Sequence, residues 1–281
     1  MRIAIVAHPR KAAAPTALRH VHDALERRGF ETVLETESAA LIGEVGCDRF
    51  WEGADLVISV GGDGTLLDTV HSMGSCAVPV AGVNIGTLGF LTACTDEGVD
   101  EFADALVRGD QVVVERPVLK VRMTDENQRA REFMALNEVV LMRGETGRLI
   151  SLEVEVDGEL LNHYRADGLI VSTPTGSTAY SLAAGGPLIG ARASVFVITP
   201  ICPHSLSNRS LVLGDESVIE VVADGGNSEA ILFTVDGRDV IRLAEQSVVK
   251  IEKGELPLKL VRMPDHSFYS TLRNKLGWSG G

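Results

Sequence analysis

The chain has 281 residues, 45% of them hydrophobic, which is the composition of one large globular domain or two joined ones. A formal net charge of −13 repels phosphate backbones and anionic lipid headgroups, so nucleic-acid and membrane partners are not expected. Four scattered cysteines predict neither a disulfide framework nor a zinc site. The first apolar stretch is too short for a signal peptide, and the uncharged stretch 168–191 is too rich in Gly, Pro, Ser and Thr to span a membrane. We therefore expect a cytoplasmic protein.

The first part of the chain alternates between strand and helix patterns. Short apolar runs predict buried strands, and apolar residues three and four apart predict helices between them. The strands are expected at 3–7, 30–34, 54–60 and 78–83, and the helices at 15–28, 66–73 and 96–108. This alternation predicts a Rossmann-like open α/β domain with parallel strands over residues 1–110.

From about residue 112 the pattern becomes β-rich. Asp157-Gly158 indicates a hairpin turn, and one helical interruption is expected near 177–184. Strands are expected at 112–116, 118–123, 133–142, 149–156, 195–199, 218–222, 231–235, 248–252 and 258–263. We expect a β-sandwich-like domain over 111–264, and a closing helix within 265–281 that returns to the first domain.

The turn Gly61-Gly62-Asp63-Gly64-Thr65 follows a buried strand and opens a helix, where open α/β sheets bind ligands. Glycines let backbone N–H groups point at phosphate oxygens, so Gly61, Gly62, Gly64 and Thr65 are candidate phosphate-binding residues. A carboxylate in such a turn suits a proton acceptor or a ligand of Mg²⁺. The structural alternative is a tight turn in which Asp63 caps the helix. No Gly-Lys-Ser/Thr follows, so this is not a Walker loop.

Three further segments carry polar groups suited to a nucleotide. Asn137-Glu138 combines an amide with a carboxylate, although Glu138 could equally be a solvated strand residue. The segment 167–187 runs from a buried strand into a turn of small and hydroxyl residues, which a flat ligand could lie against. The segment 199–209 contains His204 and Arg209, and a structural loop explains it as well as a phosphate contact does.

Together these segments resemble the NAD kinase family over nearly the whole chain. The similar motifs are GGDGT at 61–65, GVNIGTLGFLT at 82–92, NE at 137–138, TPTGSTAY at 173–180 and PICPHSL at 200–206. The resemblance implies phosphoryl transfer from ATP or polyphosphate to the 2′-hydroxyl of the adenosine ribose of NAD, which makes NADP. It also implies Mg²⁺ or another divalent cation and a homodimer or homotetramer.

The resemblance assigns the site residues as well. Asp63 would be the catalytic proton acceptor. The implied NAD-binding residues are Asp63, Gly64, Asn137, Glu138, Arg148, Arg165, Asp167, Thr178, Ala179, Tyr180, Ser181, Leu182 and Ala183. Asp68 departs from the family, because many relatives carry a basic residue there, and Arg238 stands where Gln is frequent. A lipid kinase with the same glycine motif and a non-catalytic NAD(P)-binding sensor are the alternatives, and the choice between ATP and polyphosphate stays open.

Overall fold

The computed structural model describes every residue of the chain except 75, 146, 225–230, 245, 266 and 279–281. The chain divides into unit 1, which comprises Met1–Glu115 with Leu258–Gly281, and unit 2, which comprises Arg116–Pro257. These bounds differ from those expected at residues 110 and 264. Among the described residues, no helix is both long enough and apolar enough to cross a lipid bilayer.

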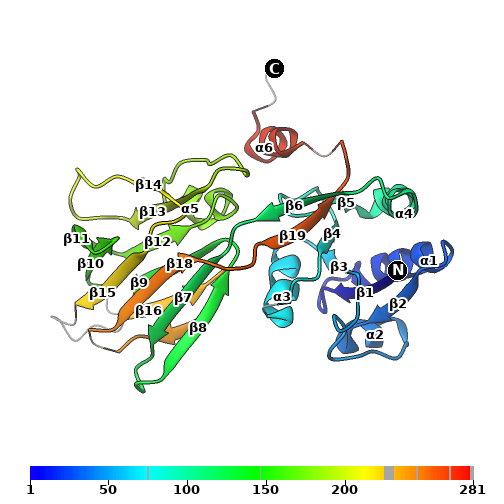
Figure 1. Ribbon diagram of the computed structural model, residues 1–281, viewed down its shortest axis with the longest axis horizontal. Helices are drawn as coiled ribbons and strands as arrows, with labels where there is room; N and C mark the ends of the chain where they lie inside the picture. Colours follow the sequence, from blue (N-terminus) through cyan, green and yellow to red (C-terminus); the bar gives the residue numbers. More distant parts are fainter. Residues whose placement is uncertain (75, 146, 225–230, 245, 266, 279–281) are drawn as a thin grey trace. The chain divides into compact units, whose positions relative to one another are not determined.

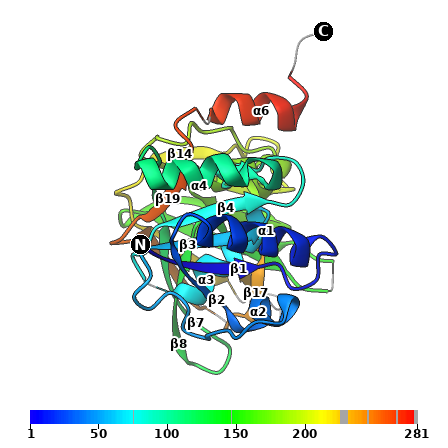
Figure 2. The ribbon, with the colours of Figure 1, turned by 90° about the vertical axis from the view of Figure 1, so that its right-hand side faces the viewer.

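Unit 1 is built on a sheet whose strands run in the order β2-β1-β3-β4-β19-β6, with β5 beside β4 (Figure 1). The pairs β1–β2, β1–β3, β3–β4, β4–β5 and β4–β19 are all parallel. Helices cover both faces, with α1 and α4 on one side and α3 on the other (Figure 2). The strands are β1 (Arg2–Ala7), β2 (Glu31–Leu34), β3 (Leu56–Gly61), β4 (Val80–Asn84), β5 (Cys94–Thr95), β6 (Val112–Arg116) and β19 (Leu258–Arg262).

The helices of unit 1 begin and end at recognisable signals. Pro15 lies in the first turn of α1, where its missing N–H costs no helical hydrogen bond. Gly43 and Gly109 end α2 and α4 in the left-handed conformation, with φ of 77° and 72°. The helices are α1 (Ala14–Glu26), α2 (Thr36–Ile42), α3 (Asp63–Met73), η1 (Asp96–Gly98), α4 (Val99–Arg108) and α6 (Phe268–Leu276).

The sequence pattern did not predict α2. This helix has seven residues and buries only Ser38 and Ala39, which is too little to show a helical period. Its start depends on Glu35, whose carboxylate accepts the backbone N–H groups of Glu37 and Ser38 at 2.8 Å each. A capping glutamate is less common than Ser, Thr, Asp or Asn, so this signal is easily missed.

The described part of unit 2 consists of two antiparallel sheets, ordered β11-β10-β15-β18-β7-β8 and β14-β13-β12-β9-β16-β17. Leu152 of the first sheet and Leu169, Phe196 and Phe233 of the second are at most 1% exposed and belong to one core. The rings of Phe133 and Phe233 lie 5.7 Å apart between the sheets. The predicted combination of a parallel α/β domain and an antiparallel β-rich domain is therefore confirmed.

The elements of unit 2 have the following bounds. Its strands are β7 (Leu119–Thr124), β8 (Ala130–Ala135), β9 (Glu138–Arg143), β10 (Ile150–Val156), β11 (Glu159–Ala166), β12 (Gly168–Ser172), β13 (Val195–Ile201), β14 (Leu211–Gly214), β15 (Ile219–Asp224), β16 (Ile231–Val235), β17 (Arg238–Arg242) and β18 (Val248–Lys253). The helical interruption consists of η2 (Gly176–Thr178) and α5 (Tyr180–Ala183).

Two expectations about the strands are corrected. The single run expected at 133–142 is broken into β8 and β9, because the Asp236 carboxylate accepts the backbone N–H groups of 136–138 and takes them out of the ladder. The strand expected at 258–263 in the β-rich domain is β19, which pairs in parallel with β4 of unit 1. A short run of apolar residues looks the same in either kind of sheet.

Candidate active site

The glycine turn joins β3 to α3 at the carboxyl edge of the parallel sheet of unit 1. A Cβ on Gly61 would lie 2.1 Å from the Oγ1 of Thr65, so the fold itself requires glycine there. Gly64 differs, because a Cβ on it would meet no atom within 4 Å. The fold does not demand glycine at position 64, and the space in front of its backbone is open for the close approach of a ligand.

Asp63 does not cap its own helix. Its carboxylate accepts two backbone N–H groups from the loop that follows β4, at 2.9 Å from Phe90 and 3.0 Å from Leu91. This contact requires glycine at position 89, because a Cβ there would lie 2.1 Å from the Oδ1 of Asp63 and would collide with it. Two amides from a separate loop therefore fix the orientation of a half-buried carboxylate beside the glycine turn.

The C-terminal segment of unit 1 holds this same loop from its other side. The Arg262 guanidinium donates to the carbonyl of Phe90, and the Phe268 ring of α6 lies 6.0 Å from the Phe90 ring. The Lys275 ammonium donates to the Thr87 hydroxyl at 3.1 Å. The loop that orients Asp63 is thus itself oriented by residues more than 170 positions further along the chain.

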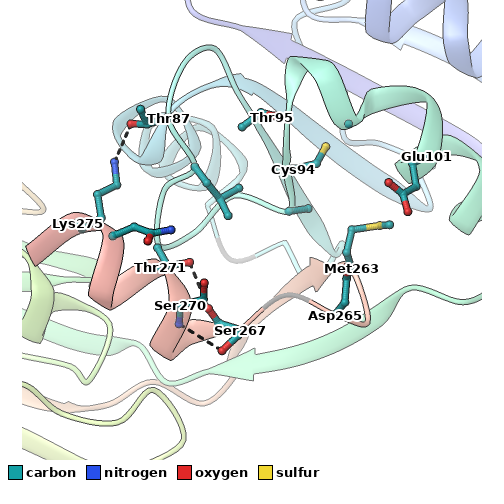
Figure 3. Close-up of a pocket in the computed structure, with 14 residues that line it drawn as sticks. Thr87, Cys94, Thr95, Glu101, Met263, Asp265, Ser267, Ser270, Thr271 and Lys275 are labelled. Atoms are coloured by element: carbon teal, nitrogen blue, oxygen red, sulfur yellow. Dashed lines mark hydrogen bonds between the residues drawn. The ribbon is translucent and has the colours of Figure 1, made fainter. Parts of the chain in front are cut away.

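A cavity of about 740 Å³ lies between this loop, β5, the start of α4 and α6. Figure 3 shows Thr87 and Lys275 on one side of it and Glu101 and Asp265 on the other. Burial, reinforced by nearby carboxylates, raises the pKa of the Cys94 thiol in its wall to about 12, so this cysteine stays a neutral thiol. None of residues 61–65 lines the cavity.

Sequence reasoning missed Lys11 as a neighbour of the glycine turn. Lys11 follows β1, and its ammonium lies 3.4 Å from the carbonyl oxygen of Gly61. The signal that could have found it is the basic pair Arg10-Lys11 directly after a buried strand, since the strand ends of a parallel sheet lie at one edge.

In unit 2, the start of β9 lies against the turn that follows β12. The backbone N–H of Thr173 donates to the carbonyl of Asn137 at 2.9 Å, and its hydroxyl donates to the carbonyl of Leu136 at 2.6 Å. A Cβ on Gly176 would lie 2.1 Å from the Asn137 carbonyl oxygen. The two motifs around residues 137 and 173–180 therefore form one cluster.

Glu138 is the most perturbed acid of this cluster. It is 5% exposed, and burial together with the nearby negative charge of Asp236 raises the pKa of its carboxyl to about 8, although the Tyr180 backbone N–H acts against this. Its Oε2 has no hydrogen-bond partner among the described residues. An oxygen buried without a partner is unfavourable, and a ligand hydroxyl would relieve it.

The side chains of the small-residue segment 178–183 differ in their exposure. The Ser181 hydroxyl is buried and hydrogen-bonds to the Thr199 hydroxyl at 3.0 Å, so its side chain is already engaged. Tyr180 is 39% exposed and Ala183 is exposed, while Thr178, Ala179 and Leu182 are half-buried. Any ligand along 178–183 would therefore contact backbone and small side chains, with Tyr180 as the one large ring.

The remaining predicted residues lie elsewhere in unit 2. Asp167 pairs with Arg143, a residue that sequence reasoning missed, through a 2.6 Å contact from Nε to Oδ1. Arg165 lies exposed in β11, and its carbonyl accepts the backbone N–H of His204 at 2.8 Å. Arg148 lies exposed between β9 and β10. The structure thus joins Asn137 and Glu138 to the 173–180 turn, and it places Asp63, Gly64 and Thr65 in unit 1.

Comparison with known proteins gives the family. Residues 3–111 match the model of the ATP-NAD kinase N-terminal domain, and residues 136–263 match that of the C-terminal domain. The NAD kinase of Gemmatimonas aurantiaca is 38% identical over 100% of this chain and 97% of its own length. That of Geotalea daltonii is 40% identical over 82% of this chain and 81% of its own.

Solved structures agree with this. An NAD kinase from Archaeoglobus fulgidus in complex with ATP has a TM-score of 0.77 and 27% identity, and the match covers 100% of both chains. Yeast NADH kinase complexed with NADH has a TM-score of 0.89 over 100% of this chain and 88% of that one, and at 23% identity it supports the fold alone. With both domain models and relatives along its full length in agreement, the chain belongs to the NAD kinase family.

Proposed function

We propose that this chain transfers a phosphoryl group from ATP, or from polyphosphate, to the 2′-hydroxyl of the adenosine ribose of NAD, with Asp63 as the proton acceptor. The observation that supports Asp63 most strongly is its carboxylate, which two amides of the Phe90-Leu91 loop orient beside a glycine turn. Family membership supports the acceptor NAD over a lipid.

The reaction is an in-line displacement at phosphorus. The 2′-oxygen forms a bond to the terminal phosphorus while the bond from that phosphorus to the bridging oxygen of the donor breaks. The hydroxyl proton passes to the Asp63 carboxylate, and ADP or shortened polyphosphate leaves with the electron pair. A positioned base contributes about 10²- to 10⁴-fold to such a step.

The other predicted residues would bind and orient the substrates. Backbone N–H groups of Gly61 to Thr65 would bear the charge on the transferring phosphate. Asn137 and Glu138 would bind the adenosine and its ribose, and the unpartnered Oε2 of Glu138 suits a ribose hydroxyl. The dinucleotide would lie along 178–183, with Arg148, Arg165 and Asp167 as the outer polar contacts.

A divalent cation fits this site as part of the donor. The described residues contain no group of three His, Cys, Asp or Glu side chains arranged to hold a metal ion. Mg²⁺ commonly keeps several waters and binds substrate phosphates with only one or two carboxylates, so the donor phosphates would supply its main ligands. The ion would neutralise charge on the phosphates.

We further propose a cytoplasmic enzyme that forms a homodimer or homotetramer. The first apolar stretch, too short for a signal peptide, supports the location, and the resemblance to the family supports the assembly. Sedimentation of the pure protein measures the assembly directly.

The assay is NADP formation from NAD, ATP and Mg²⁺, followed with an NADP-specific dehydrogenase. Asp63→Asn should lower turnover by at least about 10²-fold. Because an amide nitrogen cannot accept the N–H of Phe90 or Leu91, NAD binding by calorimetry and thermal unfolding are measured on the same variant. Asp23→Asn, which removes an exposed charge from α1, is the matched control. Wild-type turnover in Asp63→Asn would disprove the role of Asp63, and NAD binding without NADP formation in the wild type would favour the sensor alternative.

A further inference from the structure

The turn that follows β1 lies beside the end of β3. Ala7 pairs with Val60, and the backbone N–H of His8 donates to the carbonyl of Val60 at 2.9 Å. The His8 Nδ1 then accepts the backbone N–H groups of Arg10 at 3.1 Å and Lys11 at 3.2 Å. The path of residues 8–11 is therefore fixed next to the strand that leads into the glycine turn.

The side chain of Lys11 reaches over the backbone of this turn. Its Nζ lies 3.4 Å from the Gly61 carbonyl oxygen and 3.4 Å from where a Cβ on Gly62 would stand. Gly61 uses one of three ammonium donors, at a distance that indicates a weak hydrogen bond. Among the described residues, no carboxylate forms an ion pair with Lys11. In a chain with a net charge of −13, this cation has donors to spare beside a candidate phosphate site.

Helix α3, which follows the glycine turn, carries a negative charge at Asp68, opposite to that of Lys11. Asp68 lies exposed on α3, five residues after Asp63. A carboxylate there repels a polyanionic donor instead of binding it. Helix α3 contains no lysine or arginine that could contact the donor from this side.

We propose that the Lys11 ammonium binds the phosphates of the phosphoryl donor at the Gly61-Gly62 turn, and that it is the cation which α3 does not supply. This inference rests on the proposed phosphoryl transfer. Lys11 and the glycine turn both belong to unit 1, and the proposed contact is with the donor. A charge-assisted hydrogen bond to phosphate is strong enough for its loss to weaken donor binding by about 10- to 100-fold.

The test compares Lys11→Gln with Arg10→Gln. Both remove one positive charge from the same exposed turn, but only Lys11 is placed against Gly61. Lys11→Gln should raise the KM for ATP about 10- to 100-fold and leave the KM for NAD nearly unchanged, and Lys11→Arg should keep most of the affinity. Arg10→Gln should change neither constant by more than about twofold.

A second variant asks whether the two positions are exchangeable. Adding Asp68→Arg to Lys11→Gln should lower the KM for ATP again, because α3 then supplies a cation to the donor site. An unchanged KM for ATP in Lys11→Gln, or an equal rise in Arg10→Gln, would overturn the proposal.

Direct binding separates this inference from the proposed reaction. Calorimetry with ATP and with tripolyphosphate, each with Mg²⁺, should show about 10- to 100-fold weaker binding to Lys11→Gln than to the wild type. If the wild type binds a donor but makes no NADP, the proposed function fails and this comparison still decides the role of Lys11. If the wild type binds neither donor, both proposals are wrong.

Discussion

Asp63 in unit 1 and Glu138 in unit 2 are two carboxyl groups held in opposite ways. Asp63 is half-buried, and each of its oxygens accepts a backbone N–H, from Phe90 and from Leu91. Glu138 is 5% exposed, one of its oxygens has no described partner, and the pKa of its carboxyl is raised to about 8. The first carboxyl is oriented by hydrogen bonds, and the second is kept protonated near neutral pH by burial.

The difference shows how backbone amides orient a carboxylate. Asp236 of unit 2 is buried like Glu138, but its carboxylate accepts three N–H groups, from Leu136, Asn137 and Glu138. Its charge then adds to the burial that raises the pKa of Glu138. Both oxygens of Asp63 and of Asp236 thus accept backbone N–H groups, whereas Glu138 accepts one, from Tyr180, and its Oε2 accepts none from the described residues.

The largest effect should come from crowding the Asp63 carboxylate. In Gly89→Ala the new methyl group would lie 2.1 Å from the Asp63 Oδ1, so either the carboxylate or the loop must move. We expect turnover to fall by at least about 10²-fold, close to Asp63→Asn, because Asp63, the proposed proton acceptor, loses its orientation. Gly214→Ala is the control, since a Cβ there meets nothing within 4 Å. Normal turnover in Gly89→Ala would show that the two amides do not matter for catalysis.

A second prediction concerns the protonation of Glu138. Its pKa is about 8 in the folded protein, against 4.5 for an ordinary glutamate carboxyl. Between these values the folded form holds a proton that the unfolded form has lost, so the free energy of unfolding should fall as pH rises from about 4.5 to about 8, and level off outside that window. The contribution is on the order of a few kcal/mol.

Urea denaturation at several pH values checks this. Other groups titrate in the same range, so the quantity to compare is the difference between the wild type and Glu138→Gln, which cannot ionise. A difference that does not change from pH 5 to pH 8 would mean that the Glu138 carboxyl is already ionised in the folded protein, and the contrast with Asp63 would disappear.

The structural features that were predicted from the sequence are those that depend on residues close together in the chain. The buried strand that ends at the glycine turn, and the Asp63 carboxylate in it, follow from residues 54–65 alone. The cluster around Asn137 follows only in part: its residues were predicted, but the Asp236 carboxylate that breaks the strand there is 98–100 positions away.

The rest depends on contacts with no local period. Lys11 and Gly61 are 50 positions apart, and Arg262 and Phe90 are 172 apart. Hydrophobic periodicity reports which face of an element is buried, and it does not report which distant residue lies on that face. The same limit explains why β19 was assigned to the wrong sheet.

The smallest predicted effect tests whether the C-terminal segment contributes to the orientation of Asp63. Phe268→Leu keeps an apolar group beside Phe90 but removes the ring contact at 6.0 Å, which is worth about 0.5–1.5 kcal/mol. Arg262 still donates to the Phe90 carbonyl, so the loop should shift only partly, and we expect kcat to fall by less than about tenfold with the KM for NAD unchanged. Tyr269→Leu is the control, because it also removes an aromatic ring from α6. Tyr269 is 66% exposed, and its ring contact is with Phe268 instead of Phe90. Equal kcat in both variants would mean that the N–H groups of Phe90 and Leu91 stay in place without α6, and that the loop after β4 orients Asp63 by itself.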